Sequence, residues 1–269
     1  MTLAVLTTPR ALPEAVWSVW SWMRFVAQTC AARIVIDGDC DFGESAAVQS
    51  VLPGVQIDPA GTLTRSLKAL YPGLREFADT HPLGTKLVLT LALQAESDLL
   101  YSDSDVLVFN NPQILATRIT GRVPSYNQEE HSTSYDPAMI AAGERTGMRP
   151  ADRVNSGLFF LPRQSIPLER AEVLIREWRP GGHSWFSEQA AMALLLNEIG
   201  GDPLPANTYV VSNARQFWWQ KDVDYGAIHT RHFTGPTRHL LYSKGLRYLR
   251  QTIAGSSGTN PKPAGIMKN

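Results

Sequence analysis

Cysteine is scarce in this 269-residue chain, which contains only Cys30 and Cys40. The two residues flank the apolar run 34–36, which is typical of a strand, and a strand keeps its two ends apart. Because a disulfide requires Cα atoms within about 7 Å, we expect free thiols and a reducing, cytoplasmic compartment. The sequence has no Cys-x-x-Cys pair and no clustered histidines beside them, which argues against a cysteine-based zinc site.

The sequence also lacks an excess of positive or negative charge, and it lacks long hydrophobic runs. Lys plus Arg and Asp plus Glu number 25 each, so the formal net charge is zero. This balance excludes a general basic field, and we predict no nucleic acid partner. The tryptophan-rich stretch 14–29 is interrupted by polar and charged residues, and it falls short of the about 18 apolar residues that a membrane span needs. We therefore expect no transmembrane segment. We also expect no signal peptide, because the start of the sequence lacks a basic region and has the pattern of a first strand.

The chain does have alternating strand and helix patterns. In chain order, the pattern predicts a strand at 3–7, a helix at 12–28, strands at 32–36 and 55–58, helices at 62–79 and 85–94, strands at 99–101, 121–126 and 157–161, a helix at 168–178 and an amphipathic helix at 187–197. This order predicts an α/β fold with a mostly parallel central sheet flanked by helices. We expect one Rossmann-like domain over residues 1–254 and a disordered Gly-, Ser-, Pro- and Lys-rich tail at 255–269.

An acidic pair at the end of a predicted strand is the most informative feature. Asp103 and Asp105 stand one residue apart, with apolar sequence on both sides. Ligands of α/β sheets bind beyond the carboxyl ends of the strands, and two carboxylates there can hold Mn²⁺ or Mg²⁺. The alternative is a plain turn, since Asp and Ser favour turns. The apolar flanks favour the metal site, because neighbouring buried carboxylates repel each other without a cation.

The stretch LLYSDSDVLVF, with this acidic pair at its centre, resembles the Asp-x-Asp segment of GT-A glycosyltransferases, particularly family 8 and its bacterial relatives. The upstream GTKLVLTLAL and the downstream NSGLFFLP resemble segments that precede and follow the metal site in that family. In order and spacing, the resemblance covers most of residues 1–250. It implies a GT-A fold, and it implies donor contacts from Lys86, Asp103, Ser104, Asn155, Ser156 and Gly157.

A histidine segment near the C-terminus extends the resemblance. His232, Gly235 and Arg238 resemble the His-x-x-Gly-x-x-Lys segment of the family, with Arg in place of Lys. The resemblance implies that His232 is the third metal ligand, that Gly235 lets the backbone approach the diphosphate, and that Arg238 binds phosphate, which arginine can do bidentately. The alternative is an imidazole without a metal, and the ligand could also be His229 or His239.

Two residues at the start of the helix at 187–197 are candidates for catalysis. The family places an acidic residue and a glutamine beside the transferring sugar, which here corresponds to Glu188 and Gln189. A structural account is also complete, since Ser187 is a good N-cap and a first-turn carboxylate favours the helix dipole. The resemblance further implies that the anomeric configuration is retained.

Other polar and aromatic residues carry weaker signals. Thr7, Thr8 and Arg10 follow the first strand, where the fold places the nucleobase. We expect Trp17 and Trp20 to be core residues, and we expect Trp218 and Trp219 to form a sugar platform or a pair with one ring packed inward. Asp37 and Asp39 indicate either a turn or a nucleoside contact. Residues 127–153 are either an acceptor loop or a solvated surface, and they include Glu129, Glu130, His131, Tyr135 and Asp136.

These features together predict a metal-dependent glycosyltransferase. It would transfer a sugar from a nucleoside-diphosphate sugar, with uridine as the base implied by the family, to an acceptor that the sequence does not identify. One alternative is a catalytically inactive nucleotide-sugar binding protein. Another is a sugar-phosphate nucleotidyltransferase, which ranks lower because no glycine-rich loop follows the first strand.

Overall fold

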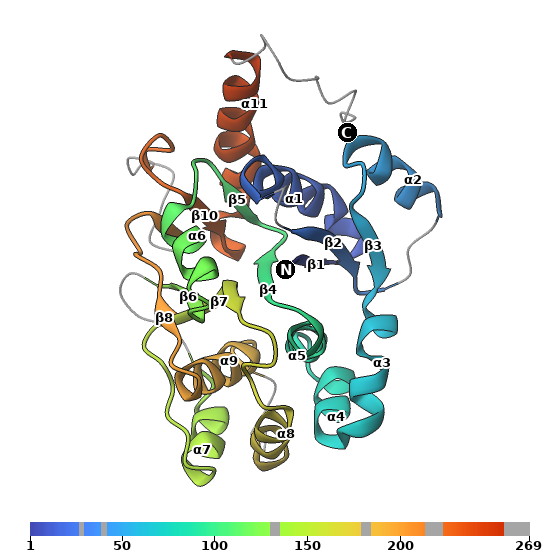
Figure 1. Ribbon diagram of the computed structural model, residues 1–269, viewed down its shortest axis with the longest axis vertical. Coiled ribbons are helices and arrows are strands. Elements are labelled where there is room, and N and C mark those ends of the chain that lie inside the picture. Colours follow the sequence, from blue (N-terminus) through green and yellow to red (C-terminus); the bar gives the residue numbers. More distant parts are fainter. Residues whose placement is uncertain (27–29, 39–41, 130–134, 179–183, 213–222, 256–269) are drawn as a thin grey trace.

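A seven-stranded sheet forms the centre of the computed structural model, which describes residues 1–26, 30–38, 42–129, 135–178, 184–212 and 223–255 (Figure 1). In the order β3-β2-β1-β4-β7-β6-β8, the strands are β3 (Gln56–Pro59), β2 (Ala31–Ile36), β1 (Thr2–Thr7), β4 (Leu99–Asp103), β7 (Val154–Leu161), β6 (Ser125–Gln128) and β8 (Asp202–Pro203). Within this sheet, β7 runs antiparallel to its neighbours β4 and β6, and the other described pairings of the sheet are parallel. The predicted mostly parallel sheet is confirmed.

Helices cover both faces of this sheet (Figure 1). The helices are α1 (Leu12–Val26), α2 (Phe42–Val51), α3 (Ala60–Leu70), α4 (Pro72–Thr80), α5 (Gly84–Glu96), α6 (Gln113–Thr120), α7 (Pro137–Arg145), α8 (Leu168–Glu177), α9 (Ser187–Glu198), α10 (Arg238–Leu240) and α11 (Leu246–Gly255). The last two, α10 and α11, pack in a separate core with Leu107 and Phe233. Because side chains alternate along a strand, Leu3 and Val5 join the core under α1, whereas Ala4 joins the core with α5 and α9. Trp17 is buried in α1 and Trp20 packs against the same core region, so the core prediction for this pair is confirmed.

A second, three-stranded sheet was not predicted. Its order is β5-β10-β9, with β5 (Val106–Val108), β10 (Thr230–Phe233) and β9 (Tyr209–Ser212). The chain leaves the large sheet at Asp103, turns, and enters the small sheet at Val106. The antiparallel register pairs His232 with Val106, which places the histidine beside the acidic turn.

Several predicted elements need correction. The helix predicted at 62–79 is two helices that meet at Tyr71–Pro72, because proline lacks the amide hydrogen and disfavours helical geometry in the preceding residue. The strand predicted at 121–126 begins only at Ser125, since Gly121 ends α6. Residues 256–269 of the predicted tail lie outside the described residues, and α11 extends through Gly255.

The predicted character of α9 was also wrong. Each residue from Ser187 to Leu196 is buried, so the helix is enclosed rather than amphipathic. The N-cap position belongs to Phe186 and has no side-chain cap. Ser187 is the first residue of the helix, and its hydroxyl lies 2.7 Å from Asp136 Oδ2 and 2.9 Å from the Ser184 carbonyl oxygen, which share its single hydrogen. Among the described residues, no helix is long and apolar enough to cross a membrane.

Gly84 controls how closely α5 approaches α4. A Cβ at Gly84 would lie 2.0 Å from the Phe77 carbonyl oxygen and 2.8 Å from the Ala78 Cα. These are backbone atoms, which cannot move aside alone, so we expect Gly84→Ala to lower the free energy of unfolding by about 3 kcal/mol. The matched control is Gly61→Ala in α3, where nothing lies within 4 Å of an added Cβ. We expect the control to stabilise the protein by about 0.5 kcal/mol. Urea denaturation measures both variants, and equal stabilities would contradict this packing account.

Candidate functional site

A cavity of about 390 Å³ opens beyond the carboxyl ends of β1, β2 and β4. Thr7 and Thr8 reach it from the end of β1, and Asp37 reaches it from the end of β2. Of the other predicted site residues, its lining includes Lys86, Asp103, Ser104, Asp105 and Arg238. Residues from distant parts of the sequence therefore meet at the sheet edge where α/β proteins bind ligands.

Asp103, Asp105 and His232 form a compact ligand set beside this cavity. One ligand atom from each residue lies within 4.8 Å of the others. The His232 Nε2 atom is 3.2 Å from Asp105 Oδ1 and 3.7 Å from Asp103 Oδ2. Ser104 and Asp105 do form a turn, but the strands β4 and β5 on either side are buried. The turn and metal-site interpretations are thus compatible.

His232 is the histidine that the register brings to the acidic pair. His229 instead lies against Tyr209, with ring centroids 5.3 Å apart, and His239 is exposed. The close approach of His232 also depends on Gly157, where an added Cβ would lie 2.3 Å from the ring Cε1 atom. The absence of a side chain at Gly157 therefore makes room for the histidine.

Similar proteins were found by comparing structures and not by comparing sequences. No protein-family model and no curated protein matches the sequence. Mouse xyloside xylosyltransferase 1 superposes with a TM-score of 0.60 at 13% identity, covering 88% of this chain and 99% of that one. The galactosyltransferase LgtC, in complex with donor and acceptor sugar analogues, gives a TM-score of 0.55 at 16% identity, covering 97% and 98%. The bifunctional glycosyltransferase WbbM gives 0.56 at 14% identity, covering 87% of this chain and 46% of WbbM.

The chain has the GT-A fold. The predicted fold class is therefore confirmed. At such low identities the likeness establishes the fold alone, and it does not establish membership of family 8.

Charge compensation within this candidate site centres on Lys86 of α5. Its Nζ atom lies 3.0 Å from the Asp103 carboxylate, 3.3 Å from Ser156 Oγ and 3.8 Å from Glu188 Oε2. Burial by itself would lower the pKa of Lys86, but the Asp103 and Glu188 carboxylates outweigh burial and raise it. Tyr101 donates its hydroxyl hydrogen to Asp103 at 2.8 Å. These contacts fix the Asp103 side chain before any ligand arrives.

The second carboxylate of the pair faces two cationic groups. Burial would raise the pKa of Asp105, but the His232 imidazole, with a smaller contribution from Arg238, outweighs burial and lowers it. Likewise, burial would lower the pKa of His232, and Asp105 outweighs that effect and raises it. The His232 imidazole and the Asp105 carboxylate thus each favour the charged form of the other.

Arg238 is held at the rim of the cavity by a residue from the other end of the chain. Its Nε atom donates to Glu14 Oε2 at 2.8 Å, and Tyr242 donates to Glu14 Oε1 at 2.5 Å. Glu14 lies in α1 and is buried. This ion pair holds the guanidinium at the rim of the cavity that Asp103 and Asp105 also line, and no sequence pattern indicated it.

Glu188 and Gln189 lie behind the cavity rather than in its described lining. The Glu188 carboxyl is 1% exposed, and its Oε2 atom accepts from Ser156 Oγ at 2.8 Å. Burial raises the pKa of Glu188 despite the nearby Lys86, and Oε1 has no hydrogen-bond partner among the described residues. Gln189 Oε1 accepts from the Ser156 amide at 3.4 Å. The main contacts of the Glu188 carboxylate are therefore the ion pair with Lys86 and the hydrogen bond from Ser156.

Some predicted residues lie elsewhere, and some residues of the site were missed. Arg10 and Gly235 are exposed, whereas Asn155 and Gly157 are buried on β7, and none of these four belongs to the described cavity lining. Trp185, which is 64% exposed, does line it and was not predicted. The predicted residues Asp39, Cys40, Glu130, His131, Trp218 and Trp219 lie outside the described residues.

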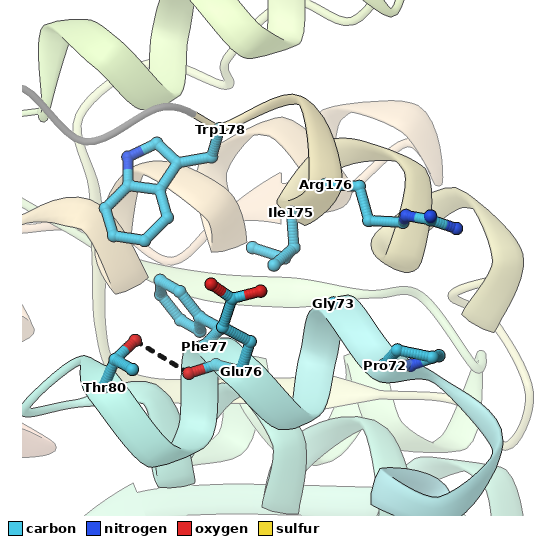
Figure 2. Close-up of a pocket in the computed structure, with 8 residues that line it drawn as sticks. All are labelled: Pro72, Gly73, Glu76, Phe77, Thr80, Ile175, Arg176 and Trp178. Carbon is cyan, nitrogen blue, oxygen red and sulfur yellow. Dashed lines mark hydrogen bonds between the residues drawn. The ribbon is translucent and has the colours of Figure 1, made fainter.

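A second cavity, of about 320 Å³, lies between α4 and α8 and is lined by residues of both helices (Figure 2). Phe77 and Trp178 face each other with ring centroids 5.1 Å apart, and the Glu76 carboxylate projects toward the space between the helices. This cavity contains none of the predicted site residues. Of the two cavities, only the one at the edge of the large sheet is lined by predicted site residues.

Lys86 can be tested by its effect on stability. We expect Lys86→Met to lower the free energy of unfolding by about 3 kcal/mol, because it leaves the buried Glu188 carboxylate without its cation. The double variant Lys86→Met/Glu188→Gln removes that buried charge and should recover a clear part of the loss. Urea denaturation of the wild type, the two single variants and the double variant measures the coupling. Strictly additive losses would contradict the proposed pairing.

Proposed function

We propose that this chain is a metal-dependent glycosyltransferase that uses a nucleoside-diphosphate sugar, with UDP as the nucleotide. The single observation that carries the proposal is the group of Asp103, Asp105 and His232 at the edge of a cavity that also presents Arg238. The GT-A fold, found in all three glycosyltransferases compared above, is consistent with it.

The donor set fits the proposed cation. Two carboxylates and one imidazole provide oxygen and nitrogen ligands, which suit Mn²⁺ and also Mg²⁺. Both carboxylates are held in place beforehand, Asp103 by Lys86 and Tyr101, and Asp105 by His232. Asp103, Asp105 and His232 would hold the metal, which when bound supplies positive charge for the diphosphate leaving group.

In this proposal, other residues of the cavity bind the phosphates and the nucleoside of the donor. Arg238 donates to phosphate oxygens from the cavity rim while Glu14 keeps the guanidinium in position. Thr7 and Thr8 contact the nucleoside at the end of β1. Lys86 neutralises Asp103, so that the acidic pair carries less net negative charge toward the diphosphate. Electrostatic stabilisation of the departing nucleotide is the main source of rate enhancement in this scheme.

The proposal also assigns roles to Gln189 and Glu188 at the start of α9. One of the similar structures is that of an LgtC variant in which an active-site glutamine is replaced by glutamate, which supports a role for Gln189 beside the transferring sugar. Glu188 supports Lys86 and Ser156 from behind. Retention of the anomeric configuration is part of the proposal and rests on the sequence resemblance alone. The cytoplasmic location rests on the cysteine content.

Hydrolysis of nucleotide sugars tests the proposed function. A panel of UDP-, GDP- and ADP-sugars is incubated with the protein in Mn²⁺ or in EDTA, and the released nucleoside diphosphate is quantified. We expect release from a UDP-sugar in Mn²⁺ and none in EDTA, and the anomer of the freed sugar, observed by NMR, reports retention or inversion. Binding of a nucleotide sugar without any release would favour the inactive binding protein instead.

A further inference from the structure

The His232 ring lies between an amide on one side and two carboxylates on the other. Its Nδ1 atom is 2.8 Å from Asn155 Oδ1. Its Nε2 atom faces Asp105 at 3.2 Å and Asp103 at 3.7 Å. The two ring nitrogens of a neutral histidine differ, since one carries the hydrogen and the other a lone pair. The partner of Nδ1 therefore decides what Nε2 offers to the acidic pair.

The contacts of Asn155 fix which way its amide points. Its Oδ1 atom accepts from the Gly157 backbone amide at 3.0 Å, and a backbone amide can only donate. Its Nδ2 atom faces two oxygens, Glu129 Oε1 at 3.3 Å and Gln189 Oε1 at 3.5 Å. A flipped amide would set donor against donor and oxygen against oxygen. The atom that faces His232 is therefore the acceptor oxygen.

An acceptor opposite Nδ1 requires that Nδ1 carry the hydrogen. The neutral ring then presents a bare Nε2 lone pair to two carboxylates, an arrangement that is repulsive until a cation lies between them. We propose that Asn155 is a positioning residue that holds His232 as the Nδ1–H tautomer and so commits Nε2 to the metal. This inference rests on the proposed metal site. Metal-bound histidines generally donate their other ring hydrogen to an oxygen of this kind.

The burial of Asn155 agrees with this role. The side chain is 5% exposed and lies outside the described cavity lining. Both of its polar atoms already have partners within the protein. Asn155 thus acts through His232, a different role from the donor contact that the sequence resemblance implies.

Manganese affinity tests the proposal without turnover. We titrate Mn²⁺ into the nucleotide-free protein and follow free Mn²⁺ by electron paramagnetic resonance. Asn155→Ala should weaken binding by about 10- to 100-fold. Asn155→Asp, made together with Glu129→Gln so that the new carboxylate oxygen does not face the Glu129 carboxylate, keeps an acceptor for both Nδ1 and the Gly157 amide and should stay within about threefold of the wild type. The matched control is Asn127→Ala, a buried asparagine directly opposite Asn155 on β6, which should leave the affinity unchanged.

The tautomer of His232 is a second readout. It can be measured without a metal, and first in the wild-type protein. Nitrogen-15 NMR of histidine-labelled wild-type protein in EDTA, at alkaline pH, should show the His232 hydrogen on Nδ1. Asn155→Ala should shift it toward Nε2. The proposal is overturned if the wild-type hydrogen is on Nε2, if Asn155→Ala binds Mn²⁺ like the wild type, or if Asn155→Asp/Glu129→Gln is as weak as Asn155→Ala. If the wild type binds no Mn²⁺, the proposed function fails, while the tautomer measurement still decides the role of Asn155.

Discussion

Asp105→Ala is expected to lower Mn²⁺-dependent release of nucleoside diphosphate by at least about 100-fold, the scale at which a lost electrostatic group acts on a transition state. Asp105 is the ligand closest to His232, at 3.2 Å. Its removal takes away one of the two carboxylates and also the anion that raises the pKa of His232. The measurement is the rate of release at saturating Mn²⁺, compared with the wild type.

The control for this variant is Asp79→Ala, in which an exposed carboxylate that pairs with Lys68 on the protein surface is lost. The control should retain full activity. Asp105→Ala should also stay folded, because buried apolar side chains and backbone pairing hold β4 and β5. If Asp105→Ala keeps the activity of the wild type, the acidic pair has no role in the chemistry.

Gly157→Ala is expected to weaken Mn²⁺ binding by at least about 10-fold through a steric effect on His232. The added Cβ would lie 2.3 Å from the ring Cε1 atom and 2.4 Å from Nδ1. Because no such contact can persist, the ring must leave the position from which Nε2 faces the acidic pair. We expect the overpacking to cost about 1–3 kcal/mol of stability as well. Mn²⁺ titration and urea denaturation measure the two effects separately.

Gly235→Ala provides the comparison, since nothing lies within 4 Å of an added Cβ at Gly235. Its affinity for Mn²⁺ alone should equal that of the wild type. If the backbone at Gly235 approaches the diphosphate, as the sequence resemblance implies, the same variant should bind UDP more weakly. Unchanged Mn²⁺ affinity in Gly157→Ala would show that the metal does not depend on the position of His232.

Local patterns predicted much of the large sheet and the acidic turn. The strand before Asp103 was predictable because short apolar runs recur between helical segments, and the apolar flanks of the acidic pair marked it as more than a surface turn. The Lys86 contact with Asp103 agrees with the resemblance to the helix upstream of the acidic segment. Such features depend on neighbours in sequence, or on motifs with a known order.

Long-range pairing could not be predicted in the same way. The small sheet joins β5 to β10, which lies over a hundred residues later, and neither strand is longer than four residues. The Glu14–Arg238 ion pair joins residues that are 224 positions apart. The enclosure of α9 arises because α5, α7, α8 and β7 pack around it. Its uninterrupted apolar run at 190–196 is typical of a buried helix, so the amphipathic prediction misread a signal that the sequence does contain. Hydrogen bonds of Asn155 likewise depend on the meeting of separate elements.

The most direct test of the account is a crystal structure of the protein with Mn²⁺ and UDP, using anomalous scattering at the manganese edge. The account predicts one strong peak bonded to Asp103, Asp105 and His232 Nε2, with the diphosphate completing the coordination and Arg238 on its phosphate oxygens. UDP bound in the cavity with no anomalous peak at these three residues, or manganese bound only elsewhere, would contradict it.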